Sequence, residues 1–122
     1  MTTDNAIVVL DDDLDCLNMT TTFLNLSELP CFAFARPQEA IDHISANPGI
    51  RLVIIDHYMP NLTGFAVAER LRALNNRDRG LFLVLLTGYM PDGHAAKQAA
   101  LFDEILKKPV DPDALLQIAS QR

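Results

Sequence analysis

Side chains suited to phosphoryl chemistry follow four of the five short apolar segments in this sequence. They are Asp11, Asp12, Asp13, Asp56, Thr87 and Lys108. If the ends of these segments meet in space, several carboxylates, a hydroxyl and an ammonium share one shallow site. This combination suits the joint binding of a metal ion and a phosphoryl group.

The carboxylates of such a site repel one another, so the site needs a partner of opposite charge. Two carboxylates about 4 Å apart repel by roughly 4 kcal/mol at an effective dielectric constant of about 20. A divalent cation offsets this repulsion, and a set of oxygen ligands favours Mg²⁺ over zinc. A carboxylate held by Mg²⁺ beside a lysine can attack a phosphoryl group and form an aspartyl phosphate.

The apolar segments that position these residues are short and rich in valine, isoleucine and leucine. They cover residues 6–10, 31–35, 52–55, 81–86 and 104–107. The first, third and fourth are almost continuously apolar, which is typical of parallel strands buried on both faces. The fifth is short and gives the weakest signal.

Segments with helical spacing of apolar residues alternate with the predicted strands. Their inward-facing or helix-starting residues are Leu14, Leu17, Thr21 and Leu24; Pro37, Ala40, Ile41 and Ile44; Val67, Leu71 and Leu74; an alanine-rich stretch at 92–101; and Asp111, Pro112, Leu115, Ile118 and Ala119. Five strand–helix units predict an open, doubly wound α/β sheet. Such sheets bind ligands at the carboxyl ends of their strands, where the reactive side chains stand.

Length and charge narrow the class of protein. A chain of 122 residues with 49% apolar residues predicts one domain, residues 1–122, with a substantial core. A net charge of −6 argues against direct nucleic-acid binding. No segment has the roughly 18 apolar residues of a membrane helix, and the N-terminus lacks a signal-peptide pattern, so we expect no membrane contact and a cytoplasmic location.

Other polar and sulfur-containing residues have plainer interpretations. Cys16 and Cys31 lack metal-ligand spacing, which predicts buried free thiols. His43 is predicted to lie on a helix surface. The arginines at 70, 72, 77 and 79 are predicted to form a solvated basic loop.

Four motifs together resemble the receiver domain of response regulators, the phosphorylated modules of two-component signalling. They are the acidic residues 11–13, the segment 56–64 with Met59-Pro60 and Gly64, Thr87-Gly88, and Lys108-Pro109. The resemblance spans essentially the whole chain, in order and at the expected spacing. It implies a flavodoxin-like fold, with a five-stranded parallel sheet of strand order 2-1-3-4-5 and five helices.

The resemblance also implies a metal site that holds Mg²⁺. Asp12 is then the direct acidic ligand, and Asp11 acts largely through water. Asp56 supplies another oxygen, and the backbone carbonyl of Tyr58 completes the protein ligands. The residues after Asp56 and Thr87 add a hypothesis: bulky Tyr58 and Tyr89 would restrict the attacking water and lengthen the phosphoryl lifetime.

The catalytic roles follow from the same resemblance. Asp56 is implied to accept phosphate from a phosphohistidine on a histidine kinase or histidine phosphotransfer protein. Thr87 is the implied switch hydroxyl, Lys108 the implied phosphate-contacting cation, and Pro109 follows it in a cis peptide bond. The domain then catalyses only its own phosphorylation and dephosphorylation. It signals to an unidentified output protein, and a homodimer through the fourth helix, last strand and last helix stays open.

Two other functions compete with this one. Asp11 and Asp13 form a D-x-D pair like that of haloacid-dehalogenase-like phosphatases, although such enzymes normally need a longer chain. Asp13 has a plainer interpretation as a helix cap. The second alternative is an interaction module that works without phosphate.

Two positions depart from the receiver pattern. Many receivers have tyrosine or phenylalanine where this chain has Ile105, and phenylalanine where it has Val110. Ile105 has neither a polar tip nor a flat ring, so the sequence predicts a switch that uses other groups.

Overall fold

The sheet at the centre of the molecule has the predicted number and order of strands. The structure is a computed structural model of the chain, and it describes residues 7–56, 63–74, 80–88 and 100–121. Five parallel strands lie in the order β2-β1-β3-β4-β5. They are β1 (Ile7–Leu10), β2 (Cys31–Phe34), β3 (Leu52–Asp56), β4 (Phe82–Thr87) and β5 (Glu104–Lys107).

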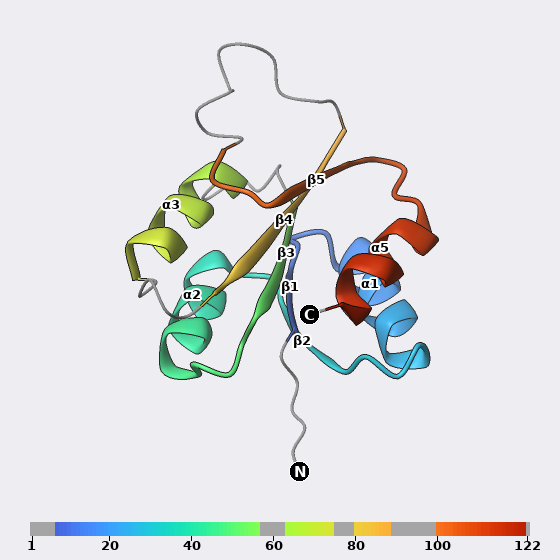
Figure 1. Cartoon of the computed structure of the whole chain (residues 1–122), viewed down its shortest axis with the longest axis horizontal. Coiled ribbons are helices and arrows are strands. Elements are labelled where there is room, and N and C mark those ends of the chain that lie inside the picture. Colours follow the sequence, from blue (N-terminus) through green and yellow to red (C-terminus); the bar gives the residue numbers. More distant parts are fainter. Residues whose placement is uncertain (1–6, 57–62, 75–79, 89–99, 122) are drawn as a thin grey trace.

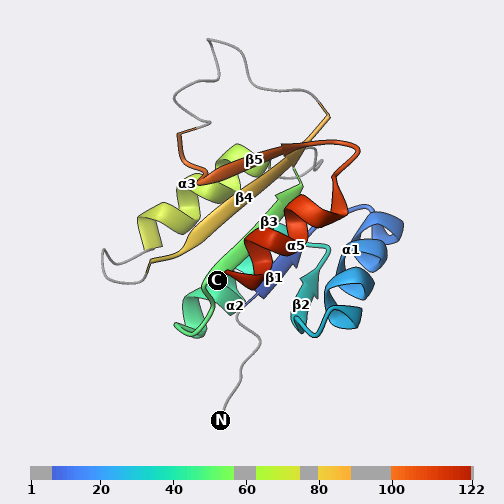
Figure 2. The same cartoon turned by 45° about the vertical axis from the view of Figure 1, so that its right-hand side comes forward.

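Helices cover both faces of this sheet. Within the described residues there are four: α1 (Leu14–Leu26), α2 (Pro37–Ala46), α3 (Gly64–Leu74) and α5 (Pro112–Ser120). Figures 1 and 2 show α2 and α3 on one face and α1 and α5 on the other. The helix predicted at 92–101 falls almost entirely outside the described residues. None of the described helices has the length and apolarity needed to cross a bilayer.

Alternation along the central strands explains why their sequences are continuously apolar. Val8 and Leu10 join the core under α2 and α3, while Ile7 and Val9 join the core under α1 and α5. The same alternation continues through β3 and β4. Both faces are therefore buried, as expected for a parallel sheet covered by helices.

The central strands run further toward the site than the sequence predicts. β3 includes Asp56 and β4 includes Thr87, because the Asp56–Leu86 and Thr87–Lys107 pairs extend the parallel ladders. Two predicted core positions are wrong. Leu14 is 61% exposed and Leu74 is 46% exposed, since they are the first residue of α1 and the last of α3 and extend past the core.

Two predicted surface residues are also wrong. The His43 ring lies between two aromatic residues of β2, with ring centroids 4.3 Å from Phe32 and 5.2 Å from Phe34. The Arg72 guanidinium donates hydrogen bonds to the carbonyls of Leu101 and Leu81 and pairs with the carboxylate of Asp103 at 2.9 Å. The His43 ring packs against another element, and the Arg72 guanidinium binds groups of other segments. The local spacing of residues in the sequence shows neither contact. Arg77 and Arg79 lie outside the described residues.

Candidate phosphoacceptor site

The carboxyl ends of β1, β3 and β4 bring three buried polar residues to one edge of the sheet. Asp11 is 4% exposed, Asp56 4% and Thr87 1%. The backbone N–H of Asp11 donates to the carbonyl of Phe34 at 3.1 Å, which ties the end of β1 to the end of β2. Buried polar groups are costly without partners, so their gathering at this edge marks it as the candidate site.

Lys108 reaches this edge from the turn after β5. Its Nζ donates to Oδ1 of Asp56 at 2.6 Å. The backbone N–H of Lys108 donates to the carbonyl of Thr87 at 2.7 Å, and the Lys108–Pro109 bond is cis, as predicted. Burial by itself lowers the pKa of Lys108, but the neighbouring Asp56 and Asp11 carboxylates outweigh it and raise that pKa. Lys108 therefore stays an ammonium at neutral pH.

The acidic residues form a cluster that fits a hard divalent cation. One carboxylate oxygen from each of Asp11, Asp12 and Asp56 lies within 4.8 Å of the others. Burial, with the nearby Asp56 carboxylate, raises the pKa of Asp11 to about 6, although the N–H of Asp13 donates to its Oδ1 at 3.0 Å. Negative charge thus exceeds what the single lysine balances. Three oxygen donors with excess charge are the set that Mg²⁺ prefers.

Asp13 has the plainer of its two predicted roles. Its side chain is the N-cap of α1, with Oδ1 accepting from the N–H groups of Asp15 at 3.0 Å and Cys16 at 3.3 Å. These bonds lower the pKa of Asp13, and the residue is exposed. A carboxylate used in this way is a poor partner for Asp11 in a D-x-D pair.

The remaining predicted site residues lie partly inside and partly outside the described residues. Tyr58, which was predicted to supply a carbonyl ligand, and Tyr89 lie outside the described residues. Thr87 ends β4 beside the turn that carries Lys108, as its predicted role requires. Ile105 is half-buried and packs against the core under α2 and α3. The roles of the site residues remain predictions.

Sequence reasoning missed a groove that opens beside the site. This α1–α5 groove has a volume of about 490 Å³. Its lining residues come from α1, α5, the ends of β1 and β4 and the chain between β5 and α5, and they include both Asp11 and Lys108. Met19 and Phe23, which lie outside the predicted core stripe of α1, were the available signal. Cys16 also lines the groove and is half-buried, as is Cys31, so both free thiols are less buried than predicted.

Proteins with similar sequences include response regulators. The model of the response regulator receiver domain family matches residues 7–120. The cyclic di-GMP phosphodiesterase response regulator RpfG of Xanthomonas campestris pv. campestris (strain 8004) is 31% identical over 112 residues, which are 89% of this chain and 29% of RpfG. The two-component response regulator PprB of Pseudomonas aeruginosa is 27% identical over 114 residues, which are 91% of this chain and 41% of PprB. The chain thus spans less than half the length of both relatives.

Solved structures share the fold. A response regulator receiver protein from Pseudomonas putida matches with a TM-score of 0.86 and 20% identity, covering 100% of both chains. The chemotaxis protein CheY4 of Vibrio cholerae matches with a TM-score of 0.80 and 20% identity, covering 94% of this chain and 95% of CheY4. A co-crystal structure of the Saccharomyces cerevisiae histidine phosphotransfer protein Ypd1 with the receiver domain of Ssk1 matches with a TM-score of 0.78 and 20% identity, covering 94% of this chain and 86% of the matched chain.

Proposed function

The chain belongs to the response regulator receiver domain family, and from this premise we propose that Asp56 accepts a phosphoryl group from a phosphohistidine. The reaction uses Mg²⁺ held at the acidic cluster of Asp11, Asp12 and Asp56. Phosphorylation then changes a surface that binds an output protein. Beyond this self-modification the chain is not an enzyme.

The contact between Lys108 and Asp56 carries the proposal. A buried carboxylate stands 2.6 Å from an ammonium and beside two further carboxylates. An ammonium fixed in this position can neutralise charge on the oxygens of a transferring phosphoryl group. When bound, Mg²⁺ supplies the rest of the charge neutralisation and orients the phosphoryl oxygens.

The transfer is a single displacement at phosphorus. An Oδ atom of Asp56 forms the new P–O bond, and the P–N bond of the phosphohistidine breaks. The bonding electron pair returns to the imidazole nitrogen. A phosphohistidine that is protonated on its other ring nitrogen leaves as a neutral imidazole. An unprotonated one takes a proton from solvent as it leaves. Lys108 moves from the carboxylate to the phosphoryl oxygens, and Thr87 donates a hydrogen bond to another of these oxygens as the switch hydroxyl.

The donor and the output partner differ in how far the comparisons support them. The Ypd1–Ssk1 complex pairs a receiver domain with a histidine phosphotransfer protein, which supports a donor of that kind or a histidine kinase. The output partner is a protein that recognises the phosphorylated form. A second copy of this chain, paired through β5, α5 and the segment before β5, is one such partner. Since Ile105 is a half-buried apolar residue that packs against the core, the switch uses groups other than an aromatic at that position.

Intact mass after treatment with acetyl phosphate and Mg²⁺ tests the proposal. We expect wild type to gain one phosphoryl group and Asp56→Asn to gain none. Asp42→Asn is the matched control, because it changes an exposed aspartate of α2 that is not part of the site and should still be labelled. Labelling in Asp56→Asn, or none in wild type, would contradict the proposal. Sustained hydrolysis of a phosphomonoester would instead support the phosphatase alternative.

A further inference from the structure

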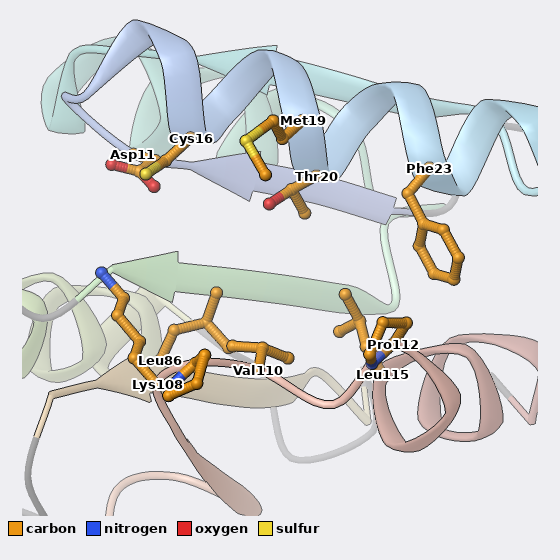
Figure 3. A pocket seen from close by; sticks show the side chains of 11 residues that line it. Asp11, Cys16, Met19, Thr20, Phe23, Leu86, Lys108, Val110, Pro112 and Leu115 are labelled. Atoms are coloured by element: carbon orange, nitrogen blue, oxygen red, sulfur yellow. The ribbon is translucent and has the colours of Figure 1, made fainter.

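One end of the α1–α5 groove is a buried carboxylate that forms no ion pair with any described side chain. Asp11 lines this end and is only 4% exposed (Figure 3). Its Oδ1 accepts a hydrogen bond from the N–H of Asp13 at 3.0 Å, whereas the nearby Lys108 ammonium pairs with Asp56. A buried charge without a paired cation is costly, so this end of the groove favours a cationic group of a ligand.

The surroundings of the groove add negative rather than positive charge. α1 and α5 contain no lysine, arginine or histidine, and each contains one aspartate, Asp15 or Asp113. At the phosphoacceptor site, three carboxylates stand against the single ammonium of Lys108. The electrostatic potential of the groove therefore attracts a cation and repels an anion.

Away from its charged end, the groove runs back along the sheet face between apolar side chains. Leu86 and Val110 lie on one side and Met19 lies opposite on α1 (Figure 3). Phe23 and Leu115 stand at the far end. The volume of about 490 Å³ falls within the range of about 300–1,000 Å³ found for ligand pockets. A ligand with a cationic head and an apolar chain matches both parts of the groove.

We propose that the α1–α5 groove binds an aliphatic primary amine. The ammonium donates a charge-assisted hydrogen bond to the Asp11 carboxylate, and the chain lies between α1 and α5 and points toward Phe23. The ammonium takes the place of a cation at the acidic cluster, so the bound amine opposes Mg²⁺ binding and slows Asp56 phosphorylation. The binding does not depend on the proposed function, but its effect on phosphorylation rests on it.

The length of the groove along α1 limits the useful length of the chain. Cys16 and Phe23, which both line the groove, are about 10 Å apart along the helix axis at a rise of about 1.5 Å per residue. Complete burial of each methylene would increase affinity about fourfold. Met19 is 72% exposed, which leaves one side of the groove open to solvent. We therefore expect about a twofold gain per methylene, and no gain once the chain reaches Phe23.

A series of amines in the presence of EDTA tests the binding. Dissociation constants for butylamine, hexylamine, octylamine and decylamine are measured from the NMR methyl signals of Met19, Val110 and Leu115. Affinity should rise about 16-fold from butylamine to octylamine and then stop rising. Hexanol, which has the same chain without the charge, should bind at least about tenfold more weakly than hexylamine. Hexanoate should not bind, because its charge has the wrong sign.

Two pairs of variants assign the binding to the groove. Thr20→Phe fills the groove and should abolish the gain with chain length, whereas Thr22→Phe, on the exposed side of the same helix, should keep it. Asp11→Asn should remove the preference for hexylamine over hexanol, whereas Asp15→Asn, an exposed aspartate of α1, should retain it. Urea unfolding checks that each variant is folded. Val110→Phe fills the groove from the opposite side if Thr20→Phe is unstable.

The effect on phosphorylation is measured separately with acetyl phosphate. Octylamine should raise the Mg²⁺ concentration that gives half-maximal labelling of Asp56, and saturating Mg²⁺ should restore the rate. Labelling at limiting Mg²⁺ that octylamine does not slow would overturn the competition between the two cations.

The outcomes separate this inference from the proposed function. Binding of hexanoate as tight as that of hexylamine, or a chain-length gain that persists in Thr20→Phe, would overturn the amine site. If Asp56 is labelled and no amine binds, this inference fails and the phosphoacceptor role stands. If the amines bind as expected but no donor labels Asp56, the proposed function fails and the amine site stands.

Discussion

Replacing Asp11 with asparagine should stabilise the metal-free protein above pH 6. The pKa of Asp11 rises from its ordinary value of 3.8 to about 6, mainly because the side chain is buried and also because Asp56 is near. One pKa unit corresponds to about 1.36 kcal/mol, so the charged form costs about 3 kcal/mol of folding free energy. Asparagine carries no charge, and its Oδ1 can still accept the hydrogen bond from the N–H of Asp13.

The pH dependence distinguishes this cause from a general packing effect. Because the folded-state pKa of Asp11 is raised, the folded protein binds more protons than the unfolded chain between about pH 4 and pH 6. The stability of wild type therefore falls as the pH rises through that window and has lost the full amount above it. Asp11→Asn lacks this loss, so its advantage over wild type should be near zero at pH 4 and reach about 1–3 kcal/mol at pH 7.5.

Urea unfolding with EDTA at several pH values measures this difference. Asp12→Asn is the matched control, since it removes the same charge from a less buried neighbour and should gain less. Added Mg²⁺ should reverse the order, because a ligand at one hundred times its dissociation constant stabilises the folded protein that binds it by about 2.7 kcal/mol. An Asp11→Asn advantage that is equal at pH 4 and pH 7.5, or a loss of stability at pH 7.5, would refute the electrostatic explanation.

Three further changes test other parts of the structure. Lys108→Met should lower the rate of Asp56 phosphorylation by about 10²–10³-fold in a mass-based time course, because it removes the ammonium beside the transferring oxygens; Lys107→Met, at an exposed neighbour, should have little effect. Arg72→Ala should reduce the free energy of urea unfolding by about 2–4 kcal/mol, because two backbone carbonyls and Asp103 lose their donor, whereas Arg70→Ala should cost less than about 0.5 kcal/mol. Asp13→Ala should cost about 1 kcal/mol as a lost N-cap and keep Asp56 phosphorylation; loss of phosphorylation would mean that Asp13 has a role in the reaction.

The central strands and the site could be predicted because their signals are local and repeated. Runs such as 52–55 are apolar at every position, and only a strand covered on both faces requires that pattern. The convergence of Asp11, Asp56 and Lys108 then follows from topology, since parallel strands end at the same edge of the sheet. The strand order came from the resemblance to a family rather than from the residues themselves.

Other features depend on partners that are distant in sequence. His43 is predicted to be a surface residue by its helix alone, and only the pairing of β2 places Phe32 and Phe34 against its ring. Arg72 belongs to a cluster of arginines, yet it binds carbonyls nine and 29 residues away. The α1–α5 groove arises between two helices and the turn that joins the last strand to the second of them. No spacing within either segment reveals it.

Burial has opposite effects on the groups at this site, and this connects its stability to its chemistry. The burial that surrounds the Asp56 carboxylate of the Lys108–Asp56 pair also makes the Asp11 charge costly, which is why the pKa of Asp11 rises. The hydrophobic cores on both faces of the sheet, which lie away from the cluster, supply the folding free energy that offsets this cost. A cation bound at the cluster, or a neutral side chain at Asp11, relieves the same repulsion, but only the cation does so while all three carboxylates stay in place to hold it beside a phosphoryl group. An acidic cluster that destabilises the resting protein is therefore what gives a cation its differential affinity for the folded state.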